Sequence, residues 1–410
     1  MALISVNEAR QRILDSLTPV DTLNLHLRAC GGRILAEEIR ADTELPPFDN
    51  SGMDGFAVRA ADTLGASPAS PRTLRVVADI PAGTSPECSI APGEAARIMT
   101  GAPIPPGADA VVPVEDTDFN NRLVGQTVPK SVRVFQPVRP GRNVRLRGSD
   151  VAVGQIVLQA GQKLRAQDLG LLAMLGFTSV QVYRQPRLAL FSSGDELILS
   201  DEPLVPGKVR DANSYTLTAL AQNAGAEVIF LGIAADTREA VKNLLDQAVE
   251  NRADLIVSSA GVSVGAFDFV KDVVESHGHL NFWKVNMRPG KPLAFGAYRE
   301  VPFFGLPGNP VSAFVGFEVF VRPAIEHLGG RQYLPRMSRT VHLAEAVESD
   351  GRETYLRAVV SQKDGQLQAR LTGHQGSGNL LSLVQANALL IIPSGVKSLP
   401  PGAAVEAWLL

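Results

Sequence analysis

The sequence predicts a multidomain protein of the α/β plus β class, with a three-layer α/β/α domain built on a mainly parallel sheet. Between Arg187 and about Gly330, apolar runs of strand length alternate with segments of helical pattern. That alternation implies a parallel sheet covered by helices on both faces. Residues 46 to about 160, and the part after Gly330, instead hold short β-like runs separated by turn residues. Such runs are typical of small antiparallel units, and the last one is expected to be a β-barrel or sandwich.

Composition and charge exclude several classes of protein. With 410 residues, 45% hydrophobic and 20% charged, the chain has the make-up of a globular protein of about two to four domains. The formal net charge of −3 and the lack of a basic run argue against a nucleic-acid partner. Cys30 and Cys88 lie far apart, so neither a disulfide scaffold nor a structural zinc site is expected. Without a signal-peptide core or a membrane-length apolar run, we expect a cytoplasmic protein with no membrane partner.

Local patterns predict the individual elements. Apolar residues at helical spacing after Val6 predict an N-terminal amphipathic helix, and residues 29–39 resemble a second helix. In the central part, Asn213 is expected to cap a helix that Gly225 ends. Functional sites on such a sheet lie at the carboxyl ends of its strands. Strands are expected at 187–193, 226–234, 253–261, 292–298 and 301–307, and helices at 214–224, 236–250, 267–276 and from Pro310 onward.

Two stretches rich in Pro and Gly precede the sheet. In residues 46–58, PPFDNSGMDGFAV, prolines fix an extended entry and the Asp-Gly pair demands a tight turn. Asp54 is therefore either a turn residue of a polar hairpin or a carboxylate presented on a rigid loop. In residues 97–116, Thr100 and Gly101 bring a hydroxyl and a backbone N–H together after a strand. That geometry suits an oxyanion, although a Pro-rich connector has the same pattern.

Acidic residues follow several predicted strands. Asp195 and Glu196 come after the run that ends in LFSSG, and Asp236 and Asp268 follow later strands. Asp236 forms a capping box with Glu239, so it is either a helix cap or a functional acid, and Asp268 has the same alternatives. Small residues before Asp268 let backbone amides approach an anion, and carboxylates beside such a nest suit a magnesium–phosphate group. The residues expected in this nest are Ser259, Gly261, Ser263 and Gly265.

Basic residues cluster around a Pro-Gly turn in residues 282–296. Lys284, Arg288 and Lys291 recur there at short spacing between apolar strands, and they would neutralise phosphate. The alternative is that they are ordinary solvated cations. Residues 303–314 then run from strand through a Gly-Pro turn into a helix, whose start is a favourable anion site. The residues expected at this helix start are Pro307, Gly308 and Asn309, with Ser312 in the first turn.

Other chemistries lack the residues that they require. No histidine accompanies a nucleophilic Ser or Cys motif, which argues against triad hydrolysis. Neither a GxxxxGK[ST] nor a GxGxxG pattern occurs. Acids, cations and amide nests remain, which are the groups needed to handle phosphates and oxyanions with a divalent ion.

Eight stretches together resemble one known family. They are PPFDNSGMDGFAV, RIMTGAPIPPGADAVVP, VRLRGSD, LFSSGDEL, SSAGVSVGAFD, KVNMRPGKP, GLPGNPVSAF and GHQGS. In this order, from about residue 44 to 379, they closely resemble the molybdopterin molybdenumtransferases, the MoeA family, to which the E domain of gephyrin is related. No single motif is decisive, but the ordered set is very specific.

The resemblance implies an activity, substrates and partners. Adenylylated molybdopterin is hydrolysed, AMP leaves, and molybdate is taken up by the pterin dithiolene, with Mg²⁺ required. A homodimer is also implied, with the upstream adenylyltransferase and molybdoenzyme acceptors as partners. The implied domains are a molybdopterin-binding α/β domain (1–22 and 170–330), a linker or dimerisation domain (23–48 and 148–169), an inserted β domain (49–147) and a C-terminal β-barrel (331–410).

The resemblance also assigns roles to individual residues. Asp54 and Thr100 match functional positions of the inserted domain, and we hypothesise that this pair closes the cleft of the partner subunit. Glu196 and Asp268 are expected to hold magnesium or to activate water. The remaining matches are the acids Asp150 and Asp236, the basic residues Lys284, Lys291 and Arg357, and the polar residue Ser377.

Two departures and two rival functions qualify the resemblance. Arg288 stands where the family usually has Lys and keeps the charge, so phosphate binding is expected to persist. Ala260 replaces a second Gly and adds one methyl group to the nest. Adenylyl transfer is one rival, but its enzymes carry a GGTG-type loop where this chain has SAGVSVG. A non-catalytic scaffold like gephyrin is the other, and the full set of acids argues against it.

Overall fold

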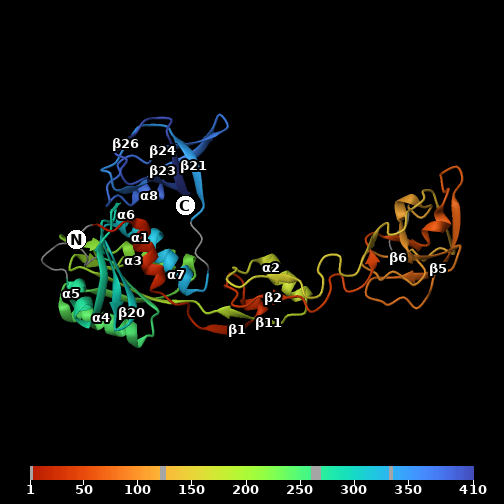
Figure 1. Ribbon diagram of the computed structural model, residues 1–410, viewed down its shortest axis with the longest axis horizontal. Helices are drawn as coiled ribbons and strands as arrows, with labels where there is room; N and C mark the ends of the chain where they lie inside the picture. The colour runs from red at the N-terminus through yellow and green to blue at the C-terminus, as the bar shows by residue number, and fades with distance from the viewer. Residues whose placement is uncertain (1–2, 121–125, 260–268, 332–335) are drawn as a thin grey trace. The chain divides into compact units, whose positions relative to one another are not determined.

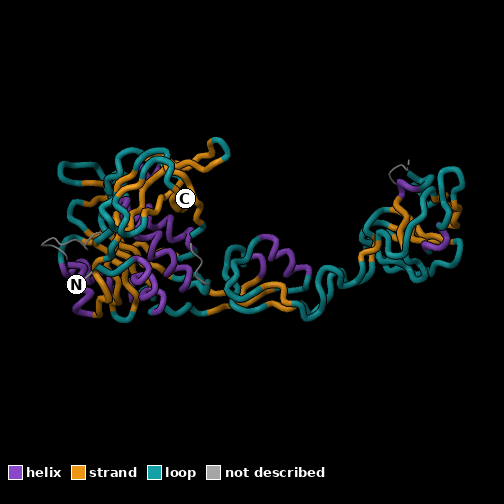
Figure 2. Tube along the Cα trace, turned by 45° about the horizontal axis from the view of Figure 1, so that its top comes forward, coloured by secondary structure: helices purple, strands orange, loops and turns teal. Residues whose placement is uncertain are grey.

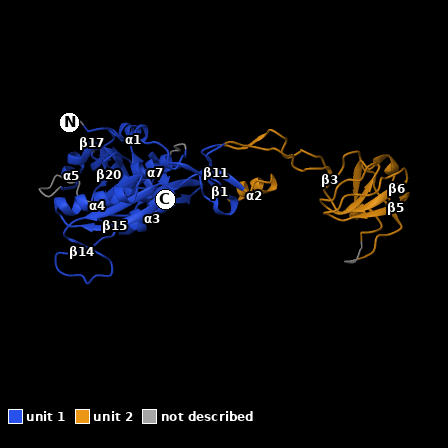
Figure 3. Cartoon of the chain, turned by 90° about the horizontal axis from the view of Figure 1, so that it is seen from below, with its two compact units in different colours: residues 1–37, 160–165, 179–410 blue, residues 38–159, 166–178 orange. Residues whose placement is uncertain are grey.

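A computed structural model describes residues 3–120, 126–259, 269–331 and 336–410 of the chain. The chain divides into two compact units, which Figure 3 colours separately. Unit 1 consists of residues 1–37, 160–165 and 179–410, and unit 2 of residues 38–159 and 166–178. Each unit has hydrophobic cores of its own.

A six-stranded sheet lies at the centre of unit 1, where Figure 1 labels its strand β20. The strand order is β15-β12-β16-β20-β19-β17. Neighbouring strands are parallel except β19, which is antiparallel to both β20 and β17. The mainly parallel sheet that the sequence predicts is therefore confirmed. Its strands are β12 (Arg187–Ser193), β15 (Glu227–Ala234), β16 (Leu255–Ser259), β17 (Gly278–Lys284), β19 (Pro292–Tyr298) and β20 (Val301–Leu306).

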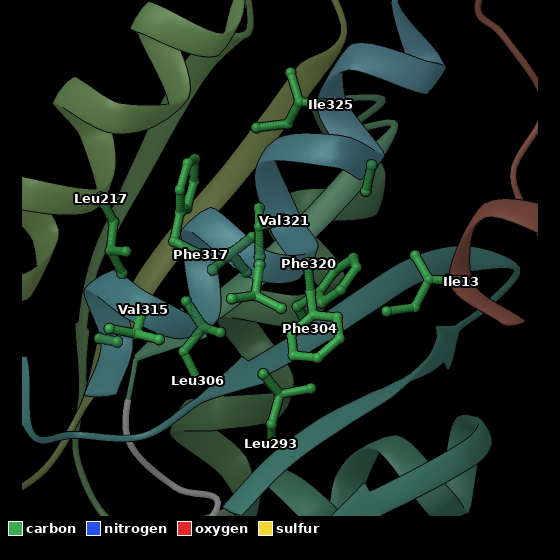
Figure 4. Packing of buried hydrophobic residues seen from close by; sticks show 14 of the residues in the cluster. Ile13, Leu217, Leu293, Phe304, Leu306, Val315, Phe317, Phe320, Val321 and Ile325 are labelled. Atoms are coloured by element: carbon green, nitrogen blue, oxygen red, sulfur yellow. The ribbon is translucent and has the colours of Figure 1, made fainter. Parts of the chain in front are cut away.

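Helices cover both faces of this sheet and complete the three layers. Apolar side chains from one set of helices form a core on the first face, where Figure 4 shows Phe304 and Leu306 of β20 among the helical residues Val315 and Phe320. A second core lies under the remaining two helices. The first set is α1 (Val6–Asp15), α3 (Asn213–Ala224), α6 (Pro310–Gly316), the π-helical η4 (Phe317–Val321) and α7 (Arg322–Leu328), and the second is α4 (Arg238–Glu250) and α5 (Phe269–His277). No helix in the described part of the chain combines the length and the apolar character needed to cross a membrane.

Five strands near the C-terminus close into the predicted β-barrel. β23 pairs with β24, β24 with β21, β21 with β27, β27 with β25, and β25 with β23 again. β18 (Met287–Arg288), from the loop between β17 and β19, adds to β23 in parallel. This pairing joins the barrel directly to the loop that carries the predicted cations. The barrel strands are β21 (Ser338–Leu343), β23 (Glu353–Lys363), β24 (Gln366–Leu371), β25 (Ala388–Ile392) and β27 (Ala404–Leu409).

Smaller elements complete unit 1. β1 and β11 form a two-stranded antiparallel sheet, and β13 pairs with β14 beside the end of β12. The short helix α8 supports the barrel strand β23 through a side chain described below. These elements are β1 (Thr22–His26), η1 (Leu27–Ala29), β11 (Ser179–Tyr183), β13 (Leu197–Ile198), β14 (Val209–Arg210), β22 (Val347–Glu348), α8 (Leu381–Val384) and β26 (Ser398–Leu399).

Unit 2 consists mainly of strands and loops (Figure 2). A five-stranded sheet has the order β7-β4-β6-β5-β8, and Phe56 packs edge-to-face against Phe119 in its core, with ring centroids 5.9 Å apart. Its strands are β4 (Gly55–Val58), β5 (Arg72–Ile80), β6 (Glu94–Ile98), β7 (Ala110–Pro113) and β8 (Ser131–Val134). The other elements are β2 (Ile39–Arg40), β3 (Asn50–Ser51), η2 (Ala60–Thr63), η3 (Val114–Asp116), β9 (Val144–Arg145), β10 (Ile156–Leu158) and α2 (Ala166–Met174).

Two local predictions are wrong. Residues 29–39 do not form a helix, because Gly32 adopts a φ of 77°, a left-handed conformation that stops a helix. Asn213 does not cap α3 but is its first residue. Asp211 instead accepts the backbone N–H of Asn213 at 3.0 Å. The predicted end of this helix at Gly225 is confirmed, since Gly225 is its left-handed C-cap with a φ of 103°.

Candidate active site

The predicted site residues of unit 1 come together at one edge of its sheet. The parallel strands β12, β15, β16, β20 and β17 all end at this edge, and the antiparallel β19 begins there. Glu196, Asp236 and Gly308 each come shortly after the end of one of these strands, β12, β15 and β20. Lys284 is the last residue of β17, and Lys291 directly precedes β19. Chain direction alone thus gathers acids and cations that are far apart in the sequence.

Asp195 and Asp236 connect the loops after β12 and β15. The Asp236 backbone N–H donates to Asp195 Oδ1 at 3.0 Å, and the Ser193 hydroxyl donates to Asp236 Oδ1 at 3.1 Å. Of the two alternatives for Asp236, the helix cap does not hold. The N-cap is Thr237, whose side chain accepts the Ala240 N–H at 3.2 Å, and the helix begins at Arg238, two residues after its expected start. The Asp236 carboxylate therefore bonds to the end of β12 and not to the start of α4.

A groove of about 650 Å³ lies along this edge. Its volume falls within the usual range for small-molecule sites, about 300–1,000 Å³. Glu196 lines the groove from the loop after β12, and the loop from Pro307 to Pro310 lines it from the end of β20. The predicted residues Glu196, Pro307, Gly308, Asn309 and Ser312 therefore share one cavity.

Asp211 and Asn213, neither of which the sequence predicts as a site residue, also line this groove. Asp211 is only 3% exposed, and its carboxylate accepts the Ser192 hydroxyl at 2.6 Å. The Asn213 amide donates to Ser259 Oγ at 2.7 Å and to the Gly308 carbonyl at 2.8 Å. The two residues hold the ends of β12, β16 and β20 together. The polar run Asp-Ala-Asn-Ser at the start of a helix is the signal that could have identified them.

A second cavity, of about 340 Å³, adjoins the groove and shares Pro292, Asn309 and Ser312 with it. Among the residues that the structure describes, no acidic side chain lines this cavity, whereas four basic ones do. The four are Arg288, Lys291, Arg352 and Arg357. Four cations around one cavity favour a bound anion, so we call this space the anion cavity.

The four cations of the anion cavity differ in their partners. Arg352 Nε donates to Asp350 Oδ2 at 3.0 Å, and Arg288 Nη1 lies 4.0 Å from the same oxygen. Within the described residues, Lys291 and Arg357 have no carboxylate at ion-pair distance. These two cations are therefore available to an anion in the cavity.

Arg357, on the barrel strand β23, is the most deeply buried of the four, with 1% of its surface exposed. Its Nε donates to Ser382 Oγ and its Nη2 to the Gly376 carbonyl, both at 3.0 Å. Both acceptors are neutral, so no negative charge offsets the burial of the guanidinium. Burial, and to a smaller extent the positive charge of Arg288, lowers the pKa of Arg357 to about 10. A guanidinium held this way suits two-point binding of an oxyanion.

The helix start at α6 differs in part from the prediction. Asn309 is the N-cap and Pro310, which has no N–H, occupies the first turn. The Val311 N–H donates to the Ser377 carbonyl at 3.0 Å. One backbone donor of the expected anion site at this helix start therefore positions the loop that carries Ser377, which lines the anion cavity together with the buried Ser312.

Unit 2 brings two other predicted residues into contact. The Thr100 hydroxyl and backbone N–H both donate to Asp54 Oδ1, at 2.7 and 2.8 Å. Asp54 precedes β4 and Thr100 follows β6, and these neighbouring strands are antiparallel, which is why the two residues meet. Asp150, also in unit 2, is exposed, and its N–H donates to the Leu45 carbonyl at 2.9 Å.

Some predicted residues do not contribute to the described cavities. Ser259 is buried at the end of β16, where it accepts the Asn213 amide, and Lys284 is exposed and lines neither cavity. Within the described ranges, no group of three or more His, Cys, Asp or Glu side chains is arranged to hold a metal ion. Gly261, Ser263, Gly265 and Asp268 lie outside the residues that the structure describes.

Family models match three consecutive parts of the chain. The MoeA N-terminal region (domain I and II) matches residues 4–176, and a probable molybdopterin binding domain matches residues 189–327. The MoeA C-terminal region (domain IV) matches residues 340–410. Together these matches extend over most of the chain.

Individual relatives agree with the family models. A molybdopterin molybdenumtransferase of Nostoc sp. is 41% identical over 391 residues, which cover 93% of this chain and 87% of the relative. Molybdopterin molybdenumtransferase 2 of Mycobacterium tuberculosis is 38% identical over 412 residues, covering 98% and 99%. The crystal structure of the molybdopterin biosynthesis moeA protein from Pyrococcus horikoshii is similar with a TM-score of 0.83 and 31% identity, covering 100% of both chains. The chain therefore belongs to the MoeA family of molybdopterin molybdenumtransferases.

Proposed function

We propose that this chain inserts molybdenum into a pterin dithiolene during molybdenum cofactor biosynthesis. The full-length relatives named molybdopterin molybdenumtransferase support this activity. Adenylylated molybdopterin and molybdate are the proposed substrates, and AMP is the proposed leaving group. Adenylyl transfer and a purely structural role are not favoured by these relatives.

One observation carries the proposal: the anion cavity, which four basic side chains and no acid of the described ranges line, adjoins a larger groove at the edge of the sheet. A tetrahedral dianion such as molybdate needs cations and hydrogen-bond donors without competing carboxylates. An organic substrate with a pterin and phosphates needs a longer and more varied site. We therefore assign molybdate to the anion cavity and adenylylated molybdopterin to the groove.

The residues divide the proposed reaction between them. Water cleaves the phosphoanhydride of the substrate and AMP leaves; the two thiols of molybdopterin then replace one molybdate oxygen, which departs as water with their two protons. Lys291 and Arg357 hold molybdate by charge, while Ser312 and Ser377 supply hydroxyl donors around it. No protein thiol is needed at molybdenum, because the substrate brings both sulfur atoms.

Magnesium is the proposed cofactor of the hydrolytic step. Carboxylate oxygens are the donors that Mg²⁺ prefers, and Glu196 presents such a group in the groove, close in sequence to the Asp195–Asp236 connection. This donor chemistry fits the ion, and we assign it to Glu196 and Asp268, the second of which lies outside the described residues. Bound there, Mg²⁺ would neutralise phosphate charge. Removal of divalent ions with EDTA should stop AMP release, and added Mg²⁺ should restore it.

The Asp54–Thr100 pair of unit 2 is proposed to act on the same substrate. Because the hydroxyl and the backbone N–H of Thr100 both donate to Asp54, the pair presents acceptor oxygens, which suit N–H and O–H groups of the substrate or a cation bound to it. We propose that the protein is a homodimer in which this pair serves the partner subunit's groove. A cytoplasmic location, and contacts with the upstream adenylyltransferase and with molybdoenzymes, stay predictions as well.

A reconstitution assay tests the proposed function. Purified protein is mixed with adenylylated molybdopterin, molybdate and Mg²⁺, and both AMP release and activation of a cofactor-free molybdoenzyme are measured. We expect both from the wild type. Lys291→Met should reduce cofactor formation more than AMP release, because it removes a molybdate-binding charge and leaves the groove intact. The proposal would be contradicted if the protein formed adenylylated molybdopterin from ATP and molybdopterin but produced no molybdenum cofactor.

A further inference from the structure

The loop of residues 373–377 is tied to β23 by Gln375, a side chain that the proposed chemistry does not use. Gln375 Oε1 accepts the Arg357 backbone N–H at 2.9 Å, and its Nε2 donates to the Arg357 carbonyl at 3.1 Å. Nε2 also donates to the Gly373 carbonyl at 3.1 Å. One carboxamide therefore bonds to both backbone polar groups of the buried arginine.

This contact continues a sheet at the point where a strand is missing. β24 ends at Leu371, which pairs with Ala358, so no β24 residue pairs with Arg357. A buried backbone N–H must still find an acceptor. A carboxamide has the same donor and acceptor as a peptide group. Gln375 supplies the acceptor for the Arg357 N–H and a second donor to the Arg357 carbonyl, which also accepts the Thr372 backbone N–H at 3.1 Å.

The same loop also holds the other end of Arg357. The Gly376 carbonyl accepts Arg357 Nη2 at 3.0 Å, and the Gly376 N–H in turn donates to His374 Nδ1 at 3.3 Å. Gln375, Gly376 and the following Ser377 all line the anion cavity. Backbone and guanidinium of Arg357 are thus fixed by adjacent residues of one short loop.

We infer that Gln375 is a positioning residue, which sets the place of the Arg357 guanidinium and thereby the affinity for molybdate. The inference rests on the proposed function of the anion cavity. A two-point contact between guanidinium and oxyanion tolerates little displacement. Without the carboxamide, the Arg357 N–H loses its acceptor and the strand backbone at this point is free to shift.

Two variants and a matched control test this inference. Gln375→Met removes the hydrogen bonds of the side chain and keeps its volume. Gln375→Ala removes the hydrogen bonds and most of the side-chain volume. The control is Gln385→Met, at an exposed glutamine just after α8. For each protein, the dissociation constants for molybdate and for AMP are measured by titration calorimetry, together with the melting temperature.

Both Gln375 variants should bind molybdate about tenfold more weakly, which corresponds to the loss of one or two net hydrogen bonds. Their affinity for AMP should stay within about twofold of the wild type, as should both affinities of the control. If the Gln375 variants bind molybdate as tightly as the wild type does, the inference is overturned and the proposed function stays intact. An equal loss of AMP and molybdate binding with a lower melting temperature would also overturn it, by showing a merely structural role. Failure of the wild type to bind molybdate would overturn the proposed function itself.

Discussion

Arg357 is a cation kept in the protein interior by neutral acceptors. Its partners are a serine hydroxyl and a glycine carbonyl, and its pKa of about 10 reflects the cost of keeping the charge away from water. The folded-state pKa lies below the ordinary value of 12.5, so at neutral pH this charge opposes folding. A bound dianion would offset that cost, which links anion binding to stability.

Replacement of Arg357 by Met is expected to separate stability from binding. Without an anion, the variant should be as stable as the wild type or more stable by up to about 1–3 kcal/mol, because the uncompensated charge is gone. Molybdate should raise the melting temperature of the wild type but not of the variant. Thermal melts with and without molybdate check both outcomes. A variant that molybdate still stabilises would show that Arg357 is not at the anion site.

At the scale of single elements, adjacent residues at the end of β15 have different tasks. Thr237 caps α4, whereas the carboxylate of Asp236 connects the loops after β12 and β15. Sequence patterns predict the helix itself but not the residue at which it begins, because two neighbouring polar residues both suit the N-cap. The structure decides between them.

A pair of substitutions distinguishes these two tasks. Thr237→Ala should lower the free energy of unfolding by about 1 kcal/mol, the usual value of an N-cap, and leave molybdenum transfer unchanged. Asp236→Asn should reduce transfer at least about tenfold, because it removes the charge of the carboxylate. It should change the free energy of unfolding by less than about 1 kcal/mol, because the amide keeps one acceptor oxygen for Ser193. Urea unfolding and the reconstitution assay measure both. Normal transfer by Asp236→Asn would remove this acid from the mechanism.

Element order and strand direction were predictable because each depends on local periodicity. The gathering of Glu196, Asp236 and Lys291 at one edge then follows from chain direction alone. Asp211 and Asn213 were not predictable in this way, since their roles depend on partners such as Gly308, which lies 95 residues after Asn213. The basic lining of the anion cavity also could not be predicted from the sequence, because its cations come from a sheet loop and from the barrel.

At the scale of the whole molecule, the proposed homodimer distributes function between subunits. Unit 1 contains both cavities, and unit 2 contains the Asp54–Thr100 pair. If the pair serves the partner subunit's groove, each active site takes parts from two chains. A symmetric dimer would then hold two equivalent composite sites.

Mixing two inactive variants tests this arrangement. Asp54→Asn damages unit 2 and Arg357→Met damages unit 1, and each homodimer alone should be nearly inactive. Mixed dimers should have one intact site in two, so random mixing should restore about a quarter of wild-type transfer. The activity of co-expressed and separately purified proteins is compared in the reconstitution assay. If verified mixed dimers recover no transfer activity, Asp54 and Arg357 act in the same active site from the same chain.

The order of segments along the chain has a consequence for synthesis on the ribosome. Residues 38–159 and 166–178 complete unit 2 early, while unit 1 needs residues from both ends of the chain. His327 contacts the Leu17 carbonyl at 3.2 Å across 310 residues. At translation rates of about 5–20 residues per second, the apolar face of α1 waits about 15–60 s for its partners. A nascent chain therefore forms the Asp54–Thr100 pair long before the anion cavity for molybdate can form. A chain whose translation stalls before the C-terminal barrel would have no anion cavity.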